Sequence, residues 1–200
     1  MAVRAAGLDD FEDVVARVRR LPLPAVTAWA LAPAPDIVEA RLAYSRWLVA
    51  ALLRIGRIWL DDDGAVAGGR RLRLRLSDRL RGPPPEHRHL GVTSGGFSYP
   101  DVPAACRQRL LEVAATGLRL RSSPARRTFL VQLWGAGDGA GTAPFDALVA
   151  HSLAMHQTCV VLTSGEGGTE RLRRAGFTPG GDAPAGPDGR PALVAWERPA

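Results

Sequence analysis

The sequence predicts a mixed α/β protein, and its clearest signal lies between Phe129 and Leu162. A short apolar run, a glycine-rich turn, an amphipathic run and a second apolar run follow one another there. This is the order strand, turn, helix, strand, which places two parallel strands in one sheet with a helix between them. Upstream, helical patterns precede two strand-like runs joined by a tight turn, and two more strand-like runs end the chain. We therefore predict an α/β (α+β) chain built on a mixed sheet.

The N-terminal part is predicted to begin with a short strand at Val3 to Ala6 and to continue with two helices. Asp9 or Asp10 is expected to cap the first helix, whose apolar stripe is Phe11, Val14, Val15, Val18 and Leu21. A loose connection rich in alanine and proline leads to a longer helix that begins after Asp36 and ends at Gly56. The buried side of that helix is predicted to be formed by Ile37, Tyr44, Trp47, Leu48, Ala51, Leu52 and Ile55.

The middle of the chain is predicted to hold a hairpin, a long loop and one more helix. Acidic residues followed by glycine, at 61–64, predict the hairpin turn, and no second cluster nearby would complete a metal site there. His87 and His89 supply only two ligands, so we expect no metal. Arginines at 71, 73 and 75 alternate with leucines, and 91–100 is expected to be loop. The helix that starts at Asp101 should bury Val102, Cys106, Leu110, Val113 and Ala114.

Seven residues from Gly135 to Gly141 form the glycine-rich turn, with Thr142 as the predicted N-cap of the next helix. Glycines at this place let main-chain N–H groups approach an anion at the helix N-terminus, which favours a phosphate. A linker that merely permits a tight turn explains the same glycines. A dinucleotide fingerprint is a poor match, because Gly137 and Gly139 lack the third glycine at the required spacing.

Composition excludes little beyond membrane-spanning and secreted classes. The chain has 200 residues, 46% of them hydrophobic and 23% charged. It has no apolar run near the ~20 residues that cross a bilayer, and no signal-peptide pattern, so we expect a cytoplasmic protein without a membrane partner. All 26 basic residues are arginine and the net charge is +6, which attracts polyanions such as a CoA phosphate or nucleic acid. The arginines are dispersed and no nucleic-acid motif is present, so nucleic acid ranks low as a partner. Cys106 and Cys159 are expected to be buried as small hydrophobic residues.

The layout resembles the GNAT superfamily of acyl-CoA-dependent N-acetyltransferases. The resemblance rests on the loop Ala136-Gly137-Asp138-Gly139-Ala140-Gly141, on the short helix that ends Arg174-Ala175-Gly176-Phe177, and on the order of the predicted elements. It covers most of the chain and implies a single GNAT-like domain over 1–200. Within it, 1–80 would be the N-terminal β-α-α-β-β part and 81–124 a loop with an inserted helix. The acyl-CoA-binding half and the closing strands would occupy 125–200.

The resemblance also implies a central, mostly antiparallel sheet that splays between strands four and five, with helices on both faces. Acetyl-CoA would lie in that opening as co-substrate and pass its acetyl group to an unidentified primary amine, on a small molecule or a peptide, by direct attack. No metal would be needed, and the family allows a homodimer. The residues expected to contact acetyl-CoA are Leu130, Val131, Leu133, Gly137, Asp138, Gly139, Ala140, Gly141 and Thr142.

Three positions depart from the family pattern. Ala136 replaces the usual arginine or glutamine, and Asp138 puts a carboxylate beside the expected pyrophosphate, which like-charge repulsion disfavours. Leu172 falls where the family often has a tyrosine that protonates the leaving thiolate, and leucine has no proton to donate. No strand-four glutamate supplies a base, so no catalytic residue is assigned. The alternative hypothesis is a catalytically silent GNAT-fold binding or interaction module.

Overall fold

The computed structural model describes residues 2–72, 92–93, 96–97, 102–122, 128–135, 142–164 and 169–200. After a 3-10 turn at Leu8–Asp10, its helices are α1 (Phe11–Arg20), α2 (Ala25–Leu31), α3 (Ile37–Ile55), α6 (Ala104–Leu120), α7 (Ala143–Ala154) and α8 (Thr169–Arg174). The strands are β1 (Val3–Ala5), β2 (Arg57–Asp61), β3 (Val66–Arg71), β4 (Val92–Thr93), β5 (Gly96–Phe97), β6 (Thr128–Gly135), β7 (Thr158–Thr163), β8 (Thr178–Ala183) and β9 (Leu193–Arg198).

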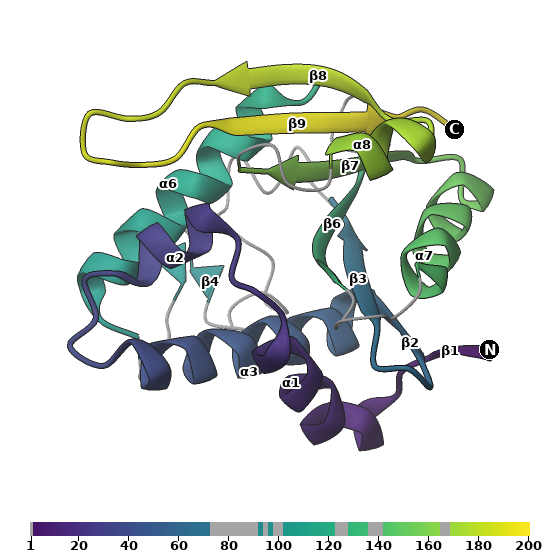
Figure 1. The fold of residues 1–200 in the computed structure, drawn as a ribbon, viewed down its shortest axis with the longest axis horizontal. Helices are drawn as coiled ribbons and strands as arrows, with labels where there is room; N and C mark the ends of the chain where they lie inside the picture. The colour runs from purple at the N-terminus through teal and green to yellow at the C-terminus, as the bar shows by residue number, and fades with distance from the viewer. Residues whose placement is uncertain are drawn as a thin grey trace.

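One seven-stranded sheet organises these elements, in the order β1-β2-β3-β6-β7-β9-β8 (Figure 1). Within the described strands, β6 and β7 are the parallel pair, and every other pairing in this sheet is antiparallel. A helix, α7, connects the two parallel strands, as the βαβ pattern predicts. The predicted α/β class with a mixed, mostly antiparallel sheet is confirmed.

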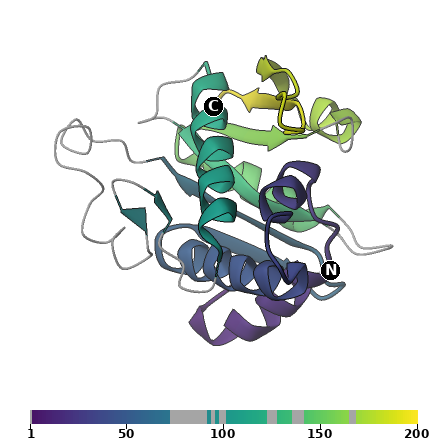
Figure 2. The same cartoon turned by 90° about the vertical axis from the view of Figure 1, so that its left-hand side faces the viewer.

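Helices cover both faces of the sheet. On one face α7 packs against β2 and β3, and on the other α1 and α3 pack against β3. The inserted helix α6 contacts β8 and β9 at the far end of the sheet, and α2 packs beside it (Figure 2). The prediction of helices on both faces is therefore confirmed.

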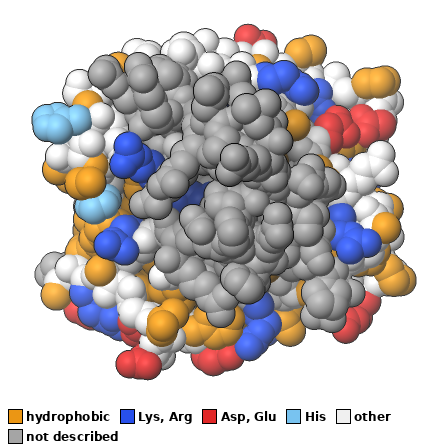
Figure 3. Space-filling view, turned by 180° about the vertical axis from the view of Figure 1, so that it is seen from behind, with side chains coloured by type: hydrophobic (Ala, Val, Ile, Leu, Met, Phe, Trp, Pro, Cys, Tyr) orange, Lys and Arg blue, Asp and Glu red, His pale blue; other side chains and the backbone are white. Residues whose placement is uncertain are grey.

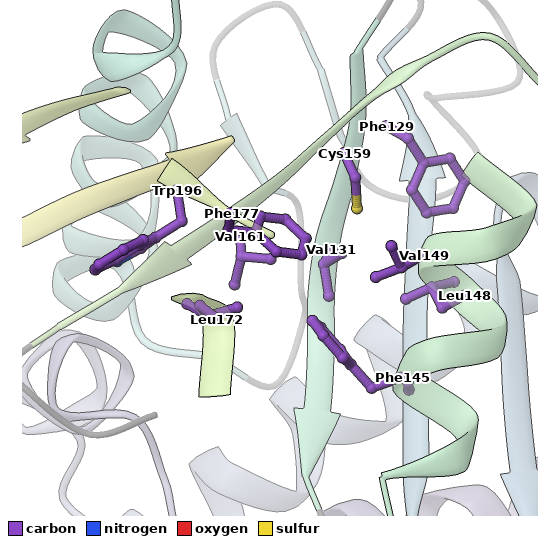
Figure 4. Packing of buried hydrophobic residues seen from close by; sticks show 11 residues of the cluster. Phe129, Val131, Phe145, Leu148, Val149, Cys159, Val161, Leu172, Phe177 and Trp196 are labelled. Carbon is purple, nitrogen blue, oxygen red and sulfur yellow. The ribbon is translucent and has the colours of Figure 1, made fainter. Parts of the chain in front are cut away.

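A separate hydrophobic core lies on each face. We call the first the α7-face core, and Figure 4 shows Phe145 and Leu148 extending from α7 into it. The α7-face core consists of Ala67, Phe129, Val131, Phe145, Leu148, Val149, Cys159, Val161, Leu172, Phe177 and Trp196. We call the second the α3-face core, which consists of Val14, Val15, Leu21, Leu48, Val49, Leu52, Ile58, Leu60, Val66 and Leu133. Because side chains alternate across a strand, one sheet supplies residues to both cores.

The two N-terminal caps behave differently. Helix α3 begins after Asp36 as predicted, and Asp36 caps it, because its carboxylate accepts hydrogen bonds from the N–H groups of Val38 (2.8 Å) and Glu39 (3.0 Å). Asp10 precedes α1 but accepts instead from the Gly7 N–H at 2.8 Å and from the Arg4 guanidinium. The Arg4 hydrogen bond and the Gly7 N–H hold the pKa of Asp10 well below its usual range.

Three expectations need correction, and some others concern residues that the structure does not describe. The connection before Asp36 contains a helix, α2, although its prolines predicted a loose chain; Pro24 stands at its N-cap, where a missing N–H costs nothing. Ile37 is 43% exposed and Ala114 is exposed, because tertiary packing rather than helical periodicity decides which turn is covered. The stretch expected as loop at 91–100 contains the paired strands β4 and β5. His87, His89, Arg73 and Arg75 lie outside the described residues.

Candidate functional site

The parallel strands β6 and β7 separate part-way along their length. They pair from Thr128 with Thr158 as far as Val131 with Val161, and no β7 residue pairs with 132–135 of β6. Beyond Val161, β7 stays paired with β9, while the same end of β6 stays paired with β3. We call the opening between 132–135 of β6 and 162–163 of β7 the strand gap. In chain order β6 and β7 are the fourth and fifth strands of the seven-stranded sheet, so the predicted splay of strands four and five is confirmed.

A β-bulge marks the start of the strand gap. In the pairing with β3, Leu133 faces Gly68 and Val131 faces Gly69, so Gln132 is an extra residue on β6. An extra residue reverses the alternation of side chains. Val131 therefore lies in the α7-face core and Leu133 in the α3-face core. The bulge thus places both faces of the sheet within reach of the same piece of β6 main chain.

The residues expected to contact acetyl-CoA divide between the two parts of β6 and the turn after it. Leu130 and Val131 lie in the part still paired with β7, whereas Leu133 lies at the strand gap. Thr142 is the N-cap of α7 as predicted, and its Oγ1 donates a hydrogen bond to Asp146 Oδ2 at 2.8 Å. The remaining predicted contacts, with Ala136 before them, lie outside the described residues: Gly137, Asp138, Gly139, Ala140 and Gly141.

Arg171 is a residue that sequence reasoning missed. It projects from α8 over the rings of Trp134 and Phe145, with its guanidinium carbon 5.2 Å and 5.1 Å from their centroids. Its Nη2 donates to the Thr142 carbonyl oxygen at 3.4 Å, so the charge lies at the start of α7. Burial lowers the pKa of Arg171, and the Asp146 carboxylate opposes that shift. Among the residues described, no carboxylate lies within ion-pair distance of it.

The opposite face of the strand gap holds a cavity of about 110 Å³, which we call the α3-face cavity. The end of α1, the turn into α2, the middle of α3 and the separated ends of β6 and β7 form it. Its lining consists of Val18, Leu21, Pro22, Leu23, Pro24, Thr27, Tyr44, Ser45, Leu48, Val131, Gln132, Leu133, Trp134 and Leu162. Among the described lining residues, Tyr44 is the one with an ionisable side chain. Burial raises the pKa of Tyr44 to about 12, and a hydrogen bond from Thr27 opposes that shift.

Polar contacts hold the walls of this cavity in place. The Arg41 guanidinium, from α3, donates to the carbonyl oxygens of Arg19 (2.7 Å) and Leu21, which end α1. The Val26 N–H, in the first turn of α2, donates to Ser164 Oγ just after β7 at 3.2 Å. These bonds satisfy main-chain groups that helix ends leave unpaired, and they tie α1, α2 and β7 around one space.

Leu172, the position that the resemblance aligns with a proton-donating tyrosine, is closed to solvent. Leu172 is fully buried in the α7-face core, beside Phe177 (Figure 4). No aspartate or glutamate occurs in β6. In the described ranges, no three His, Cys, Asp or Glu side chains gather closely enough to hold a metal ion, and no helix there is long and apolar enough to cross a membrane. Figure 3 shows basic and acidic side chains interleaved around the margin of the rear face.

Comparison with known proteins finds similarity in structure but none in sequence. No protein-family model and no curated protein sequence matches the chain. Solved structures do: the C-terminal condensation domain of Ebony, in complex with beta-alanyl-dopamine, is 8% identical and covers 99% of this chain and 100% of its own, with a TM-score of 0.60. The histone acetyltransferase HPA2 and related acetyltransferase from Corynebacterium glutamicum is 19% identical and covers 100% and 96%, with a TM-score of 0.51. A GNAT-family structure from Desulfovibrio desulfuricans is 15% identical and covers 99% and 98%, with a TM-score of 0.50.

The chain has the GNAT fold. In the order of that fold β6 and β7 are strands four and five, α7 is the helix between them, and α8 is the short helix that follows. The hairpin β4–β5 and helix α6 are inserted between strands three and four. Similarity at this level of identity establishes the arrangement of elements, and the chemistry must be argued from the residues around the strand gap.

Proposed function

We propose that this GNAT-fold chain is an N-acyltransferase that passes the acetyl group of acetyl-CoA to a primary amine. The observation that carries the proposal is the strand gap, which is bordered by a cationic side chain on one face and by a cavity on the other. An acyl transfer brings two substrates to one carbonyl carbon. A gap between strands that both faces of the sheet share offers a place for that meeting.

The α7 side of the gap suits the acyl donor. The main-chain N–H and C=O groups of 132–135 that face away from β3 have no β7 partner, so they can pair with the amides of a pantetheine arm. The N–H groups at the start of α7 and the Arg171 guanidinium can hold the anionic phosphates. Arg171 would thus supply the positive charge that Ala136 does not. We propose that the glycine turn with Gly137, Gly139 and Gly141 completes this site.

The proposed reaction requires few catalytic side chains. The amine nitrogen attacks the thioester carbonyl carbon, the new C–N bond forms as the C–S bond breaks, and one amine proton leaves with the thiolate to give free CoA thiol. Main-chain N–H groups of β6 in the gap would stabilise the oxyanion that develops on the carbonyl oxygen. Fixed donors of this kind need no reorganisation during the reaction, which is why few catalytic side chains suffice.

Two observations favour the alternative, a silent GNAT-fold binding module. Leu172 is fully buried, and β6 carries no acidic residue, so neither usual proton-transfer group is in place. Two measurements separate the proposals. We expect acetyl-CoA to bind by calorimetry, and thiol release to depend on added amine. Binding without amine-dependent thiol release would support the silent module, and no binding at millimolar acetyl-CoA would contradict the donor site itself.

A further inference from the structure

Building on the proposed acyl transfer, we infer that the α3-face cavity is the acceptor site and that it accepts a small, apolar primary amine in its uncharged form. The cavity touches the strand gap through Val131, Gln132, Leu133 and Trp134 of β6 and Leu162 of β7. A nucleophile held there would approach the gap from the face opposite Arg171. Donor and acceptor would then meet at β6 without competing for one space.

The lining of the cavity selects for apolar groups. Hydrocarbon side chains make up most of it, and the polar side chains are those of Thr27, Tyr44, Ser45 and Gln132. No lining residue that the structure describes carries a carboxylate. A second positive charge, as on a polyamine, would therefore be buried without a partner, which is strongly unfavourable. For scale, an apolar cavity of about 150 Å³ binds benzene, so a space of about 110 Å³ suits a short alkyl chain or a single ring.

No side chain that the structure describes around the cavity can remove a proton from an ammonium ion. Tyr44 keeps its own proton at neutral pH, because the ordinary pKa of a tyrosine is about 10 and burial raises the pKa of Tyr44 further, to about 12. Arg41 is engaged with the carbonyl oxygens at the end of α1. Asp13 and Arg17 of α1 pair with each other at 2.9 Å, and neither lines the cavity. Cys159 of β7 belongs to the α7-face core on the other side of the sheet.

The acceptor must therefore lose its extra proton to water before it enters. Burial in this lining disfavours the charged form of an amine, as it does for a lysine side chain. A neutral amine then carries two protons on nitrogen, keeps one in the amide product and gives the other to the departing thiolate. The balance closes without an enzyme base. The pH dependence of the reaction should consequently be that of the acceptor's own ionisation.

The test measures kcat/KM against pH for aniline, benzylamine and butylamine, whose basicity increases in that order, with 1,4-diaminobutane as the doubly charged analogue of butylamine. We expect the pH midpoint to move upward with the basicity of the amine, and butylamine to exceed 1,4-diaminobutane by about tenfold or more, because an unpaired buried charge is costly. A single midpoint shared by all the amines would show an enzyme base and overturn the inference. So would a preference for the diamine.

A pair of variants locates the acceptor. Leu23 is half-buried in the lining, so Leu23→Asp introduces a carboxylate there, while Leu8→Asp places the same charge on a side chain that is 70% exposed elsewhere. Leu23→Asp should reverse the preference toward 1,4-diaminobutane, and Leu8→Asp should leave it unchanged. Equal effects of the two would overturn the location. Acetyl-CoA binding without transfer to any of the amines overturns the acceptor inference alone, whereas loss of acetyl-CoA binding in the unmodified chain contradicts the proposed function.

Discussion

The two faces of the sheet at the strand gap differ in charge. On the α7 side, Arg171 holds a guanidinium over Trp134 and Phe145, beside the first turn of α7. On the α3 side, a cavity of about 110 Å³ has no charged side chain in its described lining. An anionic donor is stabilised by a cation, whereas an amine is reactive only when its lone pair is free. The difference suits the two halves of one acyl transfer, and it can be tested one face at a time.

The largest effect is expected on CoA binding, when a substitution removes the charge on the α7 face. Arg171→Ala should weaken CoA binding by roughly 10- to 100-fold at low salt, since hydrogen bonds to charged groups contribute ~1.5–3 kcal/mol. Arg171→Lys should recover part of the affinity, because an ammonium keeps the charge but lacks the planar fork. Calorimetric titration with CoA measures both.

Arg174→Ala is the matched control for that experiment. Arg174 lies on the same helix with its side chain 78% exposed, and its Nε pairs with Glu170 Oε1 at 3.1 Å. Arg174→Ala should leave the affinity for CoA nearly unchanged. If both variants weakened binding equally, overall charge rather than the position of Arg171 would explain the effect. The Arg171 effect should also diminish as salt is added, as it does for accessible ionic contacts.

The next prediction concerns β7, the wall that both faces share. Past the point where β6 leaves, the buried Trp196 Nε1 donates to Thr163 Oγ1 at 3.1 Å. Thr163→Val leaves that N–H without an acceptor and should lower the free energy of unfolding by ~1–3 kcal/mol. Thr163→Ser keeps the hydroxyl and should cost less. Urea unfolding measures both, and a loss in Thr163→Ser as large as that in Thr163→Val would mean that the methyl group stabilises this wall as much as the hydrogen bond does.

A smaller effect should be confined to the α3 face. A Cβ added at Gly117 of α6 would lie 2.2 Å from Leu162 Cδ1, so Gly117→Ala must push the Leu162 side chain, which lines the cavity. We expect kcat/KM for benzylamine to fall several-fold relative to butylamine, with CoA affinity unchanged. Stability should change little, since the ~1 kcal/mol that alanine adds to a helix offsets part of the crowding. Ala114→Ser, on the exposed side of α6, is the control; a change in CoA affinity would contradict the separation of the faces.

Local patterns predicted the elements that frame the strand gap. The cap at Asp36 and the helix after Thr142 follow from short-range rules, and the apolar stripe of Phe145, Leu148 and Val149 is buried as its periodicity requires. The splay between β6 and β7 was expected only through family resemblance. Periodicity alone does not reveal where two paired strands part.

The chemistry at the gap was harder to predict because it joins distant residues. Leu21 and Leu162 line one cavity although they are far apart in the sequence. The bulge at Gln132 cannot be recognised from the apolar residues around it in the sequence. Arg171 is one of three arginines in α8, and nothing in their spacing distinguishes it. Its role depends on the aromatic rings that the fold brings beneath it. Asp138 lies outside the described residues. That Asp138→Arg should tighten CoA binding, by replacing a repulsive charge with an attractive one, stays a prediction from sequence.

The smallest expected effect comes from a titrating group on the α7 face. The ring centroids of His151 and Trp59 lie 5.1 Å apart. Burial, together with the nearby Arg57 charge, lowers the pKa of His151. The unfolded chain therefore takes up a proton at higher pH than the folded chain does, so stability is lost as pH falls from the unfolded value of about 6.5 toward the folded one. His151→Phe keeps a ring and removes the proton site, and should flatten this part of the stability curve between about pH 5 and 8. His156→Asn is the control for replacing a histidine, at an exposed site with φ 52° that asparagine tolerates. If the slope persists in His151→Phe, another group carries the pH dependence, and the α7 face is not where it originates.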